Sequence, residues 1–220
     1  MTQEIFGFST ARTWDYENGY WLTSHTTRFA KALAQYELYK SIVELPGHIV
    51  ECGVYKGASL IRFATFREIL ENAHSRKIIG FDAFGAFPRS GDREDIKFIE
   101  KFERDGGEGI PLKELEAALE HKCFRNVELV PGDVHDTVPR YLQAHPEMRI
   151  AMLHLDLDVY PPSAFVLEQL HGLVVPGGII VLDDYGTVSG ATKAVDELLK
   201  RTGYTVKKLP LAHIPAYIRK

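Results

Sequence analysis

The chain has 220 residues, of which 45% are hydrophobic and 25% are charged. This composition supports one substantial core, so we expect a single domain over residues 1–220. The formal net charge of −4 disfavours a partner that is held through a nucleic-acid phosphate backbone. We therefore expect a small-molecule ligand and no nucleic-acid partner.

The cysteine spacing indicates a reduced protein, and the N-terminal residues give no indication of export. Neither Cys52 nor Cys123 has a CxxC partner, and the nine histidines lack the spacing of a zinc site. Residues 1–14 contain no basic flank followed by an apolar segment, and no apolar run reaches the roughly 18 residues of a membrane span. We therefore predict a cytoplasmic location and no membrane contact, and we expect Cys52 to be a small buried filler.

Strands and helices are predicted to alternate from residue 25 onward. Apolar residues at helical spacing mark the first helix, with Ser24 as its N-cap. The predicted helices cover 25–43, 57–70, 111–121, 137–144, 161–173 and 192–201. The predicted strands cover 48–53, 77–82, 126–132, 150–158 and 178–184, and residues 204–220 form two final strands. This order predicts an α/β fold, a three-layer sandwich with a mostly parallel sheet between layers of helices.

Residues 1–45 form a predicted N-terminal arm and helix. The aromatic side chains of this arm are Trp14, Tyr16, Tyr20 and Trp21. They could stack on a sugar face, pack on the same domain or contact a second subunit, and the sequence does not choose among these. A homo-oligomer is therefore one expectation.

Residues 84–110 are polar, charged and long for a connection between two elements. They form either a mobile lid or an inserted helix near 95–103. We favour a lid over the ends of the strands.

Carboxylates end two of the most apolar stretches of the chain. Asp156 and Asp158 close IAMLHLDLD, and Asp183 and Asp184 close GIIVLDD. If the two strands are neighbours, their ends lie about 5 Å apart, and ionised carboxylates that close repel unless a cation joins them. A single acid at a strand end can simply cap the next helix, but acids on adjacent strand ends favour a divalent metal held by oxygen ligands.

The segment ECGVYKGAS, residues 51–59, forms a glycine-containing turn from a strand into a helix. Such a turn lets a ligand approach the backbone near the free N–H groups of the helix start. Gly53 and Gly57 do not have the G-x-G-x-x-G spacing of a dinucleotide site, and Glu51 would repel a phosphate. S-adenosylmethionine, with its ammonium and sulfonium charges and a carboxylate for Ser59 and the helix start, matches these charges better.

Two further acids follow neighbouring strands. Asp82 ends the next strand, where an acid can accept hydrogen bonds from both hydroxyls of a ribose. Asp133 ends the third strand, beside the place expected for adenine. His154 lies inside an apolar strand and is expected to be a hydrogen-bonded core histidine, and His135 is expected in a surface loop.

The motifs ECGVYKGAS, GFDAF, PGD, LHLDLDVY and VLDDYG follow one another in the order of class I methyltransferases. More narrowly, the chain resembles the macrocin O-methyltransferase family of metal-dependent sugar O-methyltransferases. The resemblance implies a Rossmann-like, mostly parallel seven-stranded sheet with an antiparallel last strand. It also implies methyl transfer from S-adenosylmethionine to a sugar hydroxyl, with Mg²⁺ or Mn²⁺ as cofactor.

The resemblance also implies roles for individual residues. The metal ligands fall on Asp156, Asp183 and Asp184. The cofactor positions of the family match Glu51, Gly53, Ser59, Asp82 and Asp133. Tyr55 and Gly57 of the same glycine turn are further candidates for cofactor binding. The lysine that catechol-type relatives place three residues after the first metal acid is Val159 here, which argues against a lysine base.

We expect Asp156 to be the general base that takes the proton of the acceptor hydroxyl. Asp158 and Tyr185 are candidates for substrate contact. The acceptor would be a deoxysugar, a glycosylated natural product or a surface glycan.

Two other functions compete with this interpretation. Asp156-Leu-Asp158 also reads as the DxD metal site of a glycosyltransferase, although the second acidic pair and Glu51 disfavour a diphosphate donor. A non-catalytic protein that binds S-adenosylmethionine would explain the glycine turn but not Asp183 and Asp184.

Overall fold

The computed structural model describes residues 2–88 and 93–220. A seven-stranded sheet crosses it in the order β5-β4-β3-β6-β7-β9-β8. The strands are β3 (His48–Cys52), β4 (Ile78–Asp82), β5 (Val127–Pro131), β6 (Ile150–Leu155), β7 (Val174–Leu182), β8 (Val206–Lys208) and β9 (Ala216–Arg219). The pairs from β5 to β7 are parallel, and β9 is antiparallel to both β7 and β8. The predicted α/β sandwich with a mostly parallel sheet is confirmed.

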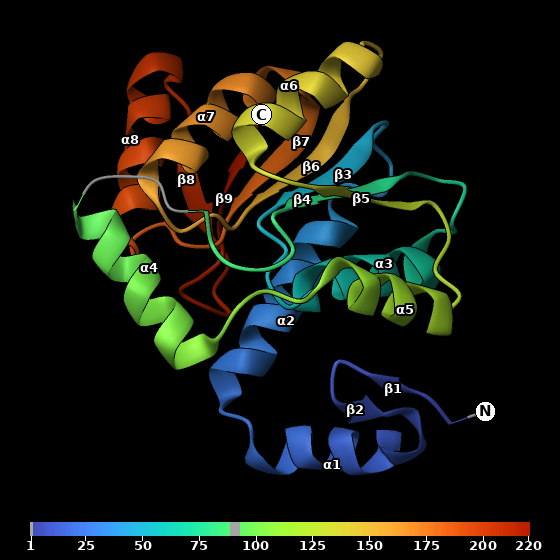
Figure 1. The fold of residues 1–220 in the computed structure, drawn as a ribbon. Helices are drawn as coiled ribbons and strands as arrows, with labels where there is room; N and C mark the ends of the chain where they lie inside the picture. Colours follow the sequence, from blue (N-terminus) through green and yellow to red (C-terminus); the bar gives the residue numbers. More distant parts are fainter. Residues whose placement is uncertain (1, 89–92) are drawn as a thin grey trace.

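Helices cover both faces of this sheet (Figure 1). One face carries α2 (Thr26–Lys40), α3 (Ala58–Leu70) and α5 (Leu112–His121), and the other carries α6 (Val134–Ala144), α7 (Tyr160–Leu170) and α8 (Ser189–Thr202). Side chains alternate between the faces, so Ile49 packs with the first set of helices and its neighbour Val50 with the second. This alternation decides which acids at the strand ends meet which helix.

The N-terminal segment adds elements that the periodicity analysis did not predict. They are the hairpin of β1 (Glu4–Ile5) and β2 (Phe8–Ser9), the short 3-10 helix η1 (Thr10–Arg12) and helix α1 (Thr13–Thr23). The Phe6 N–H donates to the Glu114 carboxylate of α5 over 2.8 Å, which ties the hairpin to the domain. Helix α1 has no buried residue, and Figure 1 shows it set apart from the sheet.

The predicted cap of the first long helix was wrong. Ser24 ends α1, and its N–H donates to the Tyr20 carbonyl. His25 is the N-cap of α2, and its ring Nδ1 accepts a hydrogen bond from the Thr27 N–H over 3.3 Å. An imidazole nitrogen can serve in this position because it offers the lone pair that the free N–H group needs.

The segment 84–110 contains the inserted helix that was one of the two expectations, α4 (Arg93–Gly106). Its action as a lid over the ends of the strands stays a prediction. The C-terminal end of α4 is held by the glycine turn, where the Tyr55 hydroxyl donates to the Gly106 carbonyl over 2.7 Å. Near its start, the Asp95 carboxylate accepts from the Tyr160 N–H of α7 over 3.3 Å. Helix α4 therefore bridges two of the loops at the ends of the strands.

Some element boundaries also differ from the expectation. Helix α6 begins at Val134 because Asp133 caps it, and β7 begins at Val174, before the apolar run that marked it. None of the described helices is long and apolar enough to cross a membrane.

Candidate functional site

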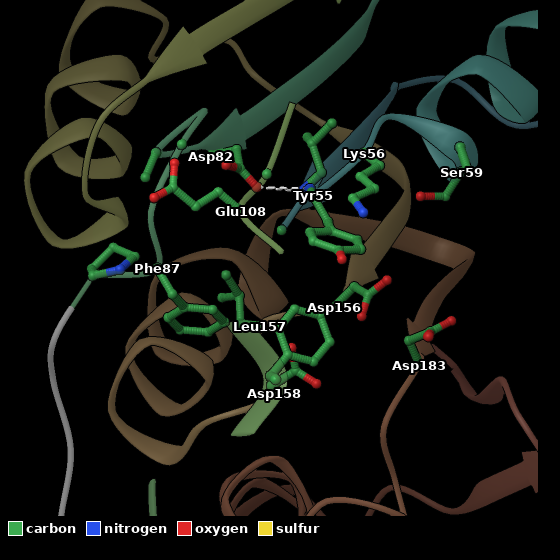
Figure 2. Close-up of a pocket in the computed structure, with 18 of the residues that line it drawn as sticks. Tyr55, Lys56, Ser59, Asp82, Phe87, Glu108, Asp156, Leu157, Asp158 and Asp183 are labelled. Carbon is green, nitrogen blue, oxygen red and sulfur yellow. Dashed lines mark hydrogen bonds between the residues drawn. The ribbon is translucent and has the colours of Figure 1, made fainter. Parts of the chain in front are cut away.

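A cavity of about 610 Å³ lies at the carboxyl ends of the parallel strands. Loops after β3, β4, β5, β6 and β7 form its floor, and α2, α4, the N-terminal hairpin and Ile214 contribute to its walls. In Figure 2, Asp156, Asp158 and Asp183 lie together on one side, and Asp82 and Glu108 lie on the other. Ligands of open α/β sheets bind at this edge.

The cavity brings together most of the residues that the sequence singled out. The predicted residues that line it are Gly53, Tyr55, Ser59, Asp82, Asp133, Asp156, Asp158, Asp183 and Asp184. Of the described residues, Glu51, Gly57 and Tyr185 are predicted site residues that do not line it. The Tyr185 hydroxyl donates to Asp196 over 3.0 Å. Its contact with the substrate stays a prediction.

The two glycines of the turn meet different neighbours. Gly53 has a φ of +89°, and a Cβ atom there would lie 1.7 Å from the Asp156 carbonyl oxygen. Gly57 has a φ of +78°, and its Cβ would lie 2.7 Å from a methyl group of Leu115 on α5. Gly53 therefore allows the end of β3 and the end of β6 to approach each other, and Gly57 allows α3 to pack on α5.

Asp82 organises the glycine turn. One carboxylate oxygen accepts from the Val54 and Tyr55 N–H groups over 2.7 and 2.9 Å. The other oxygen accepts from the Phe84 N–H over 2.6 Å. Asp82 still lines the cavity, so it can meet a ligand while it holds the turn in place.

Asp133 is the N-cap of α6, as a lone acid after a strand often is. Its Oδ1 accepts from the His135 N–H over 2.9 Å and lies 2.7 Å from the His135 ring Nδ1. His135 was expected in a surface loop, but it lines the cavity beside Asp133.

The acids after β6 and β7 form one cluster because these strands are parallel neighbours. Asp156, Asp158 and Asp184 each offer a carboxylate oxygen, and these atoms lie within 4.8 Å of one another. A second group with the same spacing joins Asp156 and Asp183 to His154. The expectation that these acids meet at one edge of the sheet is therefore correct.

Burial and the charged groups nearby give these acids different pKa values. Burial, then the Asp183 and Asp184 carboxylates, raise the pKa of Asp156 well above its ordinary value. Burial and the Asp156 and Asp183 carboxylates raise the pKa of Asp158 to about 7. Burial would also raise the pKa of Asp183, but the effects of His154 and Lys31 are larger and lower this pKa to about 2. Asp183 is therefore the member of the cluster that stays ionised most readily.

His154 links two carboxylates across three neighbouring strands. Its Nδ1 lies 3.0 Å from Glu51 Oε1, and its Nε2 lies 3.4 Å from Asp183 Oδ1. Burial alone would lower the pKa of His154, but Asp183 and Glu51 raise it to about 10. The prediction of a hydrogen-bonded core histidine is confirmed, and Glu51 is its fully buried partner.

Lys31 brings a second positive charge to the cluster from outside the sheet. Its Nζ lies 2.5 Å from Asp183 Oδ2, and 22% of its side chain is exposed. The sequence contained no sign of this contact, because Lys31 and Asp183 lie 152 residues apart in the chain. Arg62 of α3 also lines the cavity, and its Nε donates to Gln35 Oε1 of α2 over 2.8 Å.

The donor set of the cluster fits a hard divalent cation. Asp156 belongs to both groups, Asp183 to one and Asp184 to the other, and each offers a carboxylate oxygen, which Mg²⁺ and Mn²⁺ prefer over nitrogen or sulfur. Asp183 Oδ1 is buried and faces His154 Nε2 at 3.4 Å without a well-formed hydrogen bond, so this carboxylate retains acceptor capacity.

Comparison with known protein families identifies the chain. The profile of the Macrocin-O-methyltransferase (TylF) family matches residues 29–219. The chain belongs to this family. The match runs from α2 to the last strand and includes every acid of the cluster.

Curated relatives of this macrocin O-methyltransferase family member are bacterial. It is 31% identical over 170 residues to 8-demethyl-8-(2,3-dimethoxy-alpha-L-rhamnosyl)-tetracenomycin-C 4'-O-methyltransferase of Streptomyces olivaceus, covering 72% of this chain and 60% of the relative. It is 29% identical over 167 residues to mycinamicin III 3''-O-methyltransferase of Micromonospora griseorubida, covering 72% and 63%. The matches thus span less than two thirds of the relatives' own lengths.

Solved structures show the same fold. The calicheamicin methyltransferase CalS11 has a TM-score of 0.75 and 29% identity, covering 94% of this chain and 85% of CalS11. The O-methyltransferase NovP has a TM-score of 0.73 and 21% identity, covering 87% and 79%. This member of the family therefore has the class I methyltransferase fold.

Proposed function

We propose that this chain transfers a methyl group from S-adenosylmethionine to a sugar hydroxyl with the help of a divalent cation. The observation that carries the proposal is the cavity itself, which joins the glycine turn, Asp82 and Asp133 to the acids after β6 and β7. Membership of the macrocin O-methyltransferase family supports it. So do the printed names of the relatives, which act on a rhamnosylated tetracenomycin and on mycinamicin III.

The glycine turn and the two strand-end acids would hold the cofactor. Ser59 stands in the first turn of α3, lines the cavity and can receive the methionine carboxylate with the help of the helix start. Asp82 would accept from the ribose hydroxyls, and Asp133 would lie beside the adenine. Glu51 does not line the cavity, and one of its buried carboxylate oxygens makes no hydrogen bond within the described structure. Its proposed part in cofactor binding would therefore be indirect, through the residues of the glycine turn.

Asp156, Asp183 and Asp184 would hold the cation. When bound, Mg²⁺ or Mn²⁺ would acidify the acceptor hydroxyl and fix its orientation. Asp158 lines the same part of the cavity and is proposed to contact the acceptor.

Asp156 is proposed as the general base. Without a cation, burial and the Asp183 and Asp184 carboxylates raise its pKa. A bound cation would offset this repulsion and favour the ionised carboxylate that accepts the proton. The acceptor hydroxyl gives its proton to Asp156 as its oxygen bonds to the methyl carbon. The carbon–sulfur bond breaks and its electron pair stays on sulfur, so the sulfonium becomes the neutral sulfide of S-adenosylhomocysteine.

The affinity for Mg²⁺ should rise with pH between about pH 6 and about pH 8. Asp158, with a pKa of about 7, lies beside the proposed ligands Asp156 and Asp184, whose pKa values are raised as well. A cation favours the ionised carboxylates, so binding below pH 7 releases protons and the affinity falls by up to about ten-fold per pH unit for each carboxyl that titrates. Calorimetric titration in two buffers of different ionisation enthalpy measures both effects. Asp158→Asn should flatten the profile, and an affinity that does not change with pH would contradict the assignment.

Binding of S-adenosylhomocysteine tests the cofactor site. Asp82→Ala should weaken it by about 100-fold, because the variant loses a charged hydrogen-bond acceptor and frees the glycine turn. Asp105→Ala is the matched control, since Asp105 is an exposed acid of α4 that pairs with Arg104. Equal binding by Asp82→Ala and the wild type would show that the cofactor does not meet Asp82.

The same titrations separate the two competing functions. Thermal stabilisation by a nucleoside-diphosphate sugar with Mn²⁺, and not by S-adenosylhomocysteine, would favour a glycosyltransferase. Metal-independent binding of S-adenosylhomocysteine without methylation of any sugar acceptor would favour a non-catalytic protein. Methylated sugar, detected by mass spectrometry and lost on addition of EDTA, is the result that we expect.

A further inference from the structure

Lys31 forms an ion pair with a carboxylate oxygen of Asp183, one of the proposed metal ligands. It projects from α2, and its Nζ lies 2.5 Å from Asp183 Oδ2. Asp183 is nearly buried, with 4% of its side chain exposed, so this ion pair is largely shielded from water. The contact joins the covering helix to the end of β7.

The other oxygen of Asp183 faces the interior. Asp183 Oδ1 is fully enclosed and lies 3.4 Å from His154 Nε2. Asp183 nevertheless lines the cavity, so Oδ2 is the oxygen that a cation entering from the cavity would meet. Lys31 and the cation therefore need the same atom.

We propose that Lys31 is the internal counter-ion of this acid cluster and competes with the divalent cation for Asp183 Oδ2. The inference rests on the metal-dependent function proposed above. Without a bound cation, the Lys31 ammonium offsets the repulsion among the clustered carboxylates. When a cation binds, the ammonium leaves Oδ2 and moves within the cavity toward the place of the acceptor.

The structure allows this exchange without movement of the helix. Helix α2 is anchored by Leu38 and Tyr39, which are buried in the core, and by the Gln35–Arg62 hydrogen bond. The lysine has a flexible four-carbon stem that carries a compact charge, so the ammonium can move while the backbone stays in place. Lys31 lines the cavity together with Arg28, one turn earlier on the same helix.

Calorimetric titration with MgCl₂ and MnCl₂ at constant ionic strength tests the proposal. Lys31→Met removes the charge and keeps most of the volume, and it should bind both cations about ten-fold more tightly, because a competing like charge has gone. Lys31→Arg keeps the charge and should stay within about three-fold of the wild type. Arg28→Met is the matched control, since Arg28 lines the same cavity but makes no ion pair with the described acids, and its metal affinity should not change.

Thermal melting provides a second readout on the same variants. In EDTA, Lys31→Met should unfold at a lower temperature than the wild type, because Asp183 loses its partner, and MgCl₂ should raise its Tm by more than it raises that of the wild type. Unchanged or weaker metal binding by Lys31→Met would overturn the proposal. Unchanged binding would leave the metal site itself in place, whereas a wild type that binds neither cation would overturn the metal site and this inference together.

Amine labelling of the wild type decides the question if Lys31→Met does not fold. Acetic anhydride should modify Lys31 slowly in EDTA and faster in MgCl₂, as read by peptide mass spectrometry. Lys40, which is exposed at the end of the same helix, is the internal control and should react equally in both. Equal labelling of Lys31 with and without MgCl₂ would overturn the proposal.

Discussion

Replacement of Asp156 by asparagine should lower kcat by about 10³-fold or more, the range of a lost general base, and leave the affinity for S-adenosylhomocysteine within about three-fold. The physical reason is that asparagine keeps the shape of the side chain but cannot accept the proton of the acceptor hydroxyl. Asp82, the acid proposed to meet the ribose, lies across the cavity from the Asp156 carboxylate (Figure 2). Initial rates and calorimetric titration measure the two quantities.

Two further variants make the Asp156 result specific. Asp136→Asn is the control, because Asp136 is an exposed acid in the first turn of α6, and it should keep full activity. Asp156→Asn and Asp183→Asn should both weaken metal binding, since both residues are proposed ligands, and Asp156→Asn should lose more turnover at saturating Mg²⁺, since only Asp156 is the proposed base. Near-normal turnover in Asp156→Asn would refute the assignment, and loss of S-adenosylhomocysteine binding would make Asp156 a residue of the cofactor site.

Replacement of Gly53 by alanine should lower the free energy of unfolding by about 3–5 kcal/mol, from overpacking and backbone strain together. The new Cβ would lie 1.7 Å from the Asp156 carbonyl oxygen and 2.6 Å from its carbonyl carbon. These are backbone atoms, so no rotamer change relieves the clash, and the φ of +89° is itself unfavourable for alanine. Urea denaturation followed by circular dichroism measures the loss.

Gly107→Ala is a matched control for this effect. Gly107 also has a positive φ, +76°, but a Cβ there would meet nothing within 4 Å. It should therefore show only the strain of the left-handed backbone, about 1 kcal/mol. A Gly53→Ala variant that is no less stable than Gly107→Ala would show that β3 and β6 can separate at low cost. Where Gly53→Ala still folds, its displaced Asp156 should reduce turnover more than it reduces cofactor binding.

Several parts of the site could be predicted because they depend on local sequence. Parallel strands read as apolar runs, and the acids that follow them must come together at one edge of the sheet, which placed Asp156, Asp183 and Asp184 correctly. The glycine turn was recognisable because a left-handed backbone selects for glycine at Gly53 and Gly57. Helix α1, by contrast, has no buried residue and so no apolar periodicity that could predict it.

Other features of the site depend on how side chains from distant segments meet. Glu51 was assigned to the cofactor from its position in a motif, but in the fold it faces His154 across β3 and β6, inside the sheet. Tyr185 was assigned to the substrate, but its hydroxyl reaches Asp196 on α8. A motif gives the order of residues along a strand or turn, and it does not specify which neighbour a side chain finds.

The order of strands and helices, the family motifs and the acids at the strand ends could be predicted from the sequence, because each of these follows from periodicity or spacing over a few residues. The fold was needed to show that Lys31 of α2 reaches Asp183, that α4 bridges the glycine turn and α7, and that Gly53 admits the Asp156 backbone. These contacts join segments far apart in the chain. They depend on how helices pack on the sheet, and packing is set by the shapes of all the neighbours together and not by any one local pattern.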